Sequence, residues 1–234
     1  MRTSKCSPFH LFRTDLGARR SPLGKGEEKR IILGACAAIL VGTLAYGFSF
    51  GIWRSPTQAC YAAVKMPLLI FSVTVASSLI NTMLAQVIGS GLSYRQVWIC
   101  ILVSLAITAA LLGSLSPVLL FFACCLPPVD SADATSVYRT ILLGNTTLVG
   151  VCGIVGNVQL YRLLRNLTAS PAIACRVLLS WIFVSGLVGC ELSWILSPFL
   201  AKPGEPVPLI NPDAFSGNFF EYVWRAMSER SLTP

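Results

Sequence analysis

Five long apolar runs divide this chain, and each is long enough to cross a lipid bilayer. The hydrocarbon core of a bilayer is about 30 Å thick, and a helix needs about 20 apolar residues to cross it. The runs cover residues 31–52, 66–88, 97–126, 136–164 and 176–200. Because backbone N–H and C=O groups must pair internally in lipid, each run is predicted to be a helix.

The composition of the chain also indicates a membrane protein. Hydrophobic residues make up 54% of the 234 residues and charged residues 12%, which is about half the charged fraction of a typical soluble domain. We therefore expect an all-α, polytopic membrane helix bundle with five transmembrane helices. The bundle would occupy residues 31–200, between a basic arm (residues 1–30) and a tail (residues 201–234).

The positions of the positive charges predict an orientation. Lys and Arg collect on the cytoplasmic side of membrane proteins. With the N-terminus in the cytoplasm, 12 of the 18 Lys and Arg residues fall on that side and six on the other. This predicts a multi-pass protein, which we place in a bacterial inner membrane, with a cytoplasmic arm and an extracytoplasmic tail. Basic and aromatic residues are not interleaved as in a nucleic-acid groove, so no nucleic-acid partner is expected.

One carboxylate, Glu191, lies inside the fifth apolar run. A charge near the bilayer centre costs at least about 2.5–3.5 kcal/mol, so such residues usually face the bundle interior or a water-filled cavity. Lys65 directly precedes the second run and would lie at a comparable depth. We expect an ion pair between them, with Asn81 and Asn157 as further members of an intramembrane polar site. The site could be structural, with the amides bridging helices, or it could be a proton or cation relay.

Small residues recur in the last two apolar runs. Gly150, Gly153 and Gly156 are three apart in the fourth run, and Ser185 and Gly189 are four apart in the fifth. Small side chains allow membrane helices to approach closely. We expect these five residues to form a helix-packing surface. The glycine spacing is not that of a dinucleotide-binding motif.

The tail is predicted to contain a short amphipathic helix. Residues 202–208 include three prolines, which exclude a regular helix there. Beyond them, Phe219, Phe220 and Trp224 fall on one face of the predicted helix. Such a helix is expected to lie in the membrane interface.

The sequence contains no strong motif for catalysis. The single histidine, His10, lies in the basic arm, and the common hydrolase, metalloprotease and phosphate-loop motifs are absent. We expect no metal and no cofactor. The leading interpretation is a scaffold or adaptor that contacts membrane lipid and other membrane proteins or a second copy. The alternatives are a small transporter or channel subunit with Glu191 in its polar site, and a membrane-embedded enzyme.

Over residues 61–200, the order of these features resembles the YIP (Ypt-interacting protein) family in its broad sense. The resemblance rests on the five-span plan, the polar arm and a few short motifs. These motifs are Lys65-Met66-Pro67, then Asn81, then Gly89-Ser90-Gly91 leading into Ser93-Tyr94-Arg95-Gln96. The resemblance implies an integral membrane adaptor, which in eukaryotes is linked to Rab GTPases and vesicle traffic.

Overall fold

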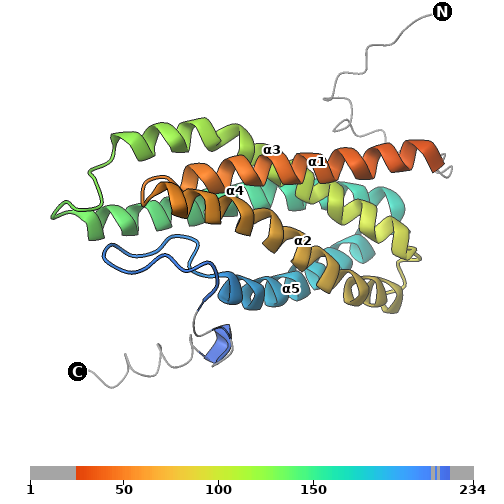
Figure 1. Cartoon of the computed structure of the whole chain (residues 1–234). Coiled ribbons are helices and arrows are strands. Elements are labelled where there is room, and N and C mark those ends of the chain that lie inside the picture. Colours follow the sequence, from red (N-terminus) through yellow and green to blue (C-terminus); the bar gives the residue numbers. More distant parts are fainter. Residues whose placement is uncertain (1–24, 212–213, 215–216, 222–234) are drawn as a thin grey trace, which may run out of the picture.

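The computed structural model describes residues 25–211, 214 and 217–221, and within these ranges it contains helices and no strand (Figure 1). The long helices are α1 (Lys25–Gly51), α2 (Pro56–Val87), α3 (Tyr94–Cys125), α4 (Ala134–Leu167) and α5 (Pro171–Leu196). All five are long and apolar enough to cross a membrane. This confirms the predicted all-α bundle with five spanning helices, and the chain is a multi-pass membrane protein. A short tail helix begins at residue 219.

Successive helices run in opposite directions, so the bundle has two ends (Figure 1). At one end α1, α3 and α5 begin and α2 and α4 finish. We call it the arginine end, after Arg95, Arg162, Arg165 and Arg176. The opposite end carries the segment that follows α5, and we call it the tail end.

Helix α1 has two main neighbours in the bundle. It packs against both α2 and α3, while α5 packs on α2 and α4 packs on α3. A hydrophobic cluster at the arginine end joins α2, α3, α4 and α5, with Leu164, Val177 and Trp181 almost fully buried in it. Toward the tail end, α4 leaves most of its side chains exposed, as expected of a helix that faces lipid, whereas residues 188–196 of α5 are half-buried.

Helix α2 has a polar buried face and an apolar exposed face. Its buried side chains include Thr74, Ser77, Ser78, Asn81 and Thr82. Its exposed side chains include Val75, Leu79 and Met83, each about 60% exposed. In water this arrangement would expose apolar surface and bury polar groups. In lipid the exposed apolar face needs no cover, so α2 on its own supports a membrane location.

Glycines set the close approach of α1 to its two neighbours. A Cβ added at Gly113 of α3 would lie 2.7 Å from the Cα of Gly42 in α1. A Cβ added at Gly47 would lie 2.5 Å from the backbone oxygen of Ala62 in α2. At these distances the neighbouring backbone would have to move, so both helix contacts require glycine.

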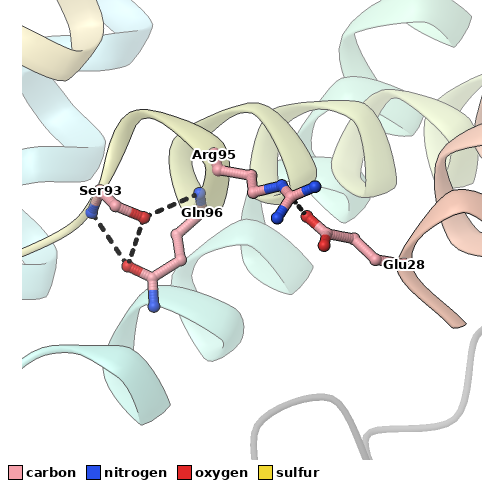
Figure 2. Close-up of polar contacts among 4 residues, drawn as sticks. All are labelled: Glu28, Ser93, Arg95 and Gln96. Carbon is pink, nitrogen blue, oxygen red and sulfur yellow. Dashed lines mark hydrogen bonds and ion pairs between the residues drawn. The ribbon is translucent and has the colours of Figure 1, made fainter. Parts of the chain in front are cut away.

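The beginning of α3 is fixed at the arginine end by two sets of contacts (Figure 2). Ser93 Oγ accepts a hydrogen bond from the N–H of Gln96, and Gln96 Oε1 accepts one from the N–H of Ser93 at 2.9 Å. This is a capping box, which satisfies free N–H groups at a helix start. Next to it, Arg95 Nε lies 2.6 Å from Glu28 Oε1, so an ion pair joins the beginnings of α1 and α3.

All five helices begin earlier than the apolar runs predict, and the difference is largest for α2. Ser55 caps α2 and Pro56 is its first residue, ten residues before the predicted beginning of the second run. The predicted run began only after the charged Lys65, so the apolar residues 59–64 and the polar Thr57 and Gln58 before them were left out. Lys65 and Pro67 therefore lie well inside α2. Similarly, Ser170 caps α5, and α5 ends at Leu196, before Pro198, instead of reaching residue 200.

Candidate functional site

Residues 197–211, which we call the tail loop, cover the tail end of the bundle (Figure 1). The N–H of Asn211 donates to the carbonyl of Ile195 at 3.1 Å, so the loop returns to the end of α5. Leu200 and Ala201 are buried within it. The loop contains four prolines, which lack a backbone N–H and exclude a helix. Its carbonyl oxygens therefore need donors from elsewhere in the chain.

Lys65 of α2 supplies two of these donors. Its side chain is 1% exposed, and Nζ donates to the carbonyls of Pro198 at 2.8 Å and Pro208 at 3.3 Å. The Phe199 ring centroid lies 6.0 Å from Nζ, which is within the range of a cation–π contact. A buried ammonium is tolerated only when its N–H groups are bonded. Lys65 thus joins two points of the tail loop to α2.

Three further side chains bind the same loop. Gln58, also in α2 and fully buried, uses both amide atoms: Nε2 donates to the carbonyl of Phe199 at 2.8 Å, and Oε1 accepts from the N–H of Ala201 at 3.3 Å. Arg54, between α1 and α2, donates to the carbonyl of Glu205 at 3.1 Å. Tyr138 of α4 donates to the carbonyl of Leu200 at 3.5 Å. The loop is therefore fastened to three parts of the bundle.

Glu191 of α5 holds the next part of the tail. Its Oε2 accepts a hydrogen bond from the N–H of Phe219 at 3.2 Å. Asn218 Oδ1 accepts from the N–H of Glu221 at 2.8 Å, so Asn218 caps the helix that begins at residue 219. A carboxylate is favourable at a helix beginning, where unpaired N–H groups carry partial positive charge. Glu191 thus anchors the beginning of the tail helix to α5.

The predicted ion pair between Lys65 and Glu191 is wrong. Lys65 binds backbone carbonyls and Glu191 binds a backbone N–H, so each charge is matched to peptide groups of opposite polarity. The pairing failed because the tail loop supplies closer acceptors for the ammonium. Glu191 is also nearer the helix end than predicted. It lies five residues before Leu196, which is about 7.5 Å along the axis.

Asn81 bridges α2 and α5, which is the structural alternative predicted for the amide side chains. Its Nδ2 donates to Ser185 Oγ of α5 at 3.2 Å, and Ser185 Oγ donates to Ser77 Oγ of α2 at 3.3 Å. Trp181 Nε1 of α5 donates to the backbone oxygen of Asn81 at 2.7 Å. Asn157, in contrast, donates to the carbonyl of Gly153 in its own helix at 2.9 Å. The structure therefore does not bring Glu191, Lys65, Asn81 and Asn157 together into one site.

The predicted packing surface is only partly formed. Gly156 is in tight contact with Thr108 of α3, and its carbonyl accepts from Ser104 Oγ at 2.8 Å. Gly189 makes an ordinary contact with α2. A Cβ added at Gly150 or Gly153 would meet no described atom within 4 Å, so neither residue packs against another described helix. Four tightly packed glycines lie outside the predicted surface. Gly42, Gly47 and Gly51 are spaced along α1, and Gly113 is in α3.

The tail side chains are described in part. The rings of Phe219 and Phe220 meet edge to face with centroids 5.4 Å apart, and Phe220 is 45% exposed. Trp224, the third predicted interfacial residue, lies outside the described residues.

Replacing Ser185 with alanine should weaken the contact between α2 and α5. The change removes the acceptor of Asn81 and the donor to Ser77, and interhelical hydrogen bonds in membranes contribute about 0.6 kcal/mol each. We expect a loss of about 0.6–1.5 kcal/mol in the free energy of unfolding. The matched control is Ser180→Ala in the same helix, because Ser180 Oγ donates only to the carbonyl of Val177 at 2.9 Å. Equal losses in the two variants would contradict the bridging role.

No protein-family model matches the chain, and neither does any curated protein or solved structure.

Proposed function

We propose that this chain is an integral membrane scaffold or adaptor without catalytic activity. The observation that supports it is the use of two membrane-helix charges, Lys65 and Glu191, to hold the backbone of the tail. A transport or catalytic group must be able to reach a substrate. Here the ammonium and the carboxylate are bonded to the chain itself, and the result is a tail fixed in position on the bundle.

The fixed tail carries partly exposed apolar side chains that could contact a partner. Leu209, Ile210 and Phe220 are 49%, 50% and 45% exposed. On this proposal they contact lipid together with another membrane protein or a second copy of the chain. The orientation we propose places the arm in the cytoplasm and the tail outside, in a bacterial inner membrane. A relation to the YIP family is part of the same proposal.

A transporter or channel subunit is the second candidate, and one observation favours it. The buried face of α2 carries a row of polar residues, from Thr74 to Thr82. Against it, the hydroxyls of Thr74, Ser77 and Thr82 donate to carbonyls of their own helix. Hydroxyls bonded in this way contribute to helix packing and leave less capacity for binding an ion.

Photo-crosslinking in native membranes tests the adaptor proposal. A benzoylphenylalanine placed at Ile210 or Phe220 should give discrete protein adducts. The matched control is Leu179 of α5, which is 60% exposed and lies toward the arginine end, where we expect only lipid adducts. Lys65→Met, which frees the tail loop, should reduce the adducts at Ile210 without changing those at Leu179.

Two results would contradict the proposal. One is an identical adduct pattern at the tail positions and at Leu179. The other is a turnover or ion flux by the purified, reconstituted protein that is abolished by Glu191→Gln. Flux that is lost in Asn81→Ala and retained in Ser180→Ala would instead support the transporter candidate.

A further inference from the structure

The hairpin of α4 and α5 carries three exposed arginines at the arginine end. Arg162 and Arg165 lie in the last turns of α4, and Arg176 lies in the second turn of α5. Only Thr168, Ala169 and Ser170 separate the two helices. No Asp or Glu occurs in the sequence between Asp133 and Glu191. The hairpin therefore has concentrated positive charge without a local counter-charge.

The three arginines are not neutralised by the described parts of the neighbouring helices. Glu28 is the acidic side chain described at this end, and it is bound to Arg95 (Figure 2). Arg162 reaches only the amide oxygen of Gln159, at 3.4 Å. The guanidinium groups thus keep most of their N–H donors available for an anion.

The tail end differs, because its charges are balanced. The described acids at this end are at least as many as the described cations. The four cations are Arg54, Lys65, Arg139 and Lys202, and the five acids are Asp130, Asp133, Glu191, Glu205 and Glu221. Lys202 and Glu205 form an ion pair at 3.4 Å, and Arg54 is bonded to the Glu205 carbonyl. An excess of uncompensated positive charge therefore marks one end of the described bundle.

Apolar side chains continue from the arginines toward the middle of the bundle. On α5, Leu179 and Phe183 are 60% and 67% exposed, and on α4, Ile154 and Val158 are 65% and 43% exposed. Below the arginines the hairpin is held rigid by the buried cluster that includes Leu164 and Val177. The surface thus presents guanidinium groups at headgroup level and apolar side chains at acyl-chain level.

We propose that this hairpin binds anionic phospholipid, with Arg162, Arg165 and Arg176 on the headgroup phosphates and the apolar side chains of α4 and α5 along the acyl chains. Guanidinium groups bind phosphate oxygens with two parallel hydrogen bonds, and basic surfaces at the ends of spanning helices are suited to anionic headgroups. The inference does not depend on the proposed adaptor function or on the orientation of the chain.

Lipid retention by the purified protein tests this inference. The full chain is extracted from nanodiscs made of phosphatidylcholine and phosphatidylglycerol, and native mass spectrometry counts the lipids that remain bound. Wild type should retain phosphatidylglycerol in preference to phosphatidylcholine. In R162Q/R165Q/R176Q that preference should fall about a hundredfold, since each basic residue near a membrane surface contributes about fivefold in binding.

The control variant is R139Q/K202Q, which removes two cations from the tail end and should keep the wild-type preference. Adding inorganic phosphate to the detergent should not displace the retained lipid, because the acyl chains contribute to binding. Equal retention of the two lipids by wild type would overturn the inference. So would a triple arginine variant with the wild-type preference, or displacement by phosphate alone.

Discussion

Replacing Gly42 with valine should destabilise the bundle more than any other single change to its packing. The Cα of Gly42 faces Gly113, and a side chain at position 42 would overlap the backbone of Ala109 in α3. Because the obstacle is backbone, a change of rotamer cannot relieve it. We expect a loss of about 3 kcal/mol or more in the free energy of unfolding, at the upper end of overpacking effects. The measurement is the fraction of folded monomer on size exclusion after heating in detergent.

Gly150→Val is the matched control for this prediction. Position 150 has no described neighbour within 4 Å of an added Cβ, and valine is tolerated in an exposed membrane helix. Its melting curve should lie close to that of wild type. Equal destabilisation by Gly150→Val and Gly42→Val would contradict the prediction. It would mean that the face of α4 around position 150, which contacts none of the described helices, is packed against something else.

Replacing Lys65 with methionine should release the tail loop. Methionine keeps the apolar stem but donates no hydrogen bond, so the carbonyls of Pro198 and Pro208 lose their bonds to Nζ. Each lost bond to a charged group costs about 1.5–3 kcal/mol, part of which water regains once the loop opens. We expect a net loss of about 2–4 kcal/mol and rapid proteolysis within residues 202–208.

Lys202→Met serves as the control for loop release. Lys202 lies in the same loop, but its side chain is 65% exposed and its ion pair with Glu205 is on the surface. Surface pairs contribute little to stability, so this variant should resist protease as wild type does. Protection of the loop in Lys65→Met would show that Gln58 and Arg54 hold it without the ammonium.

The number and type of helices could be predicted from the sequence because lipid leaves few choices. A run of about 20 apolar residues must be a helix to pair its backbone, and all five runs became helices. The beginnings of α2 and α5 could not be predicted from apolarity, because their first turns hold residues such as Gln58 and Arg176. The cap residues Ser55 and Ser170, each followed by proline, are the signals that would have placed them.

The polar contacts were harder to predict than the helices, because they depend on a segment without a periodic pattern. Glu191 was identified from the cost of a charge in a membrane and Lys65 from its comparable depth, and both do lie toward the tail end. Their partners are backbone groups of the tail, and backbone groups carry no sequence signal. Gln58 was missed for the same reason, since its bonds go to the backbone of Phe199 and Ala201.

The charge exchange Lys65→Glu with Glu191→Lys tests the central claim, that each charge holds tail backbone of opposite polarity. An ion pair between the two residues would survive the exchange, and the double variant would then be more stable than either single variant. The contacts described above predict the opposite. A glutamate at 65 would face carbonyl oxygens and a lysine at 191 would face an N–H group, so both anchors would be lost. We expect proteolysis of the tail in the double variant to be at least as fast as in either single variant. Recovery of wild-type protection in the double variant would contradict the account.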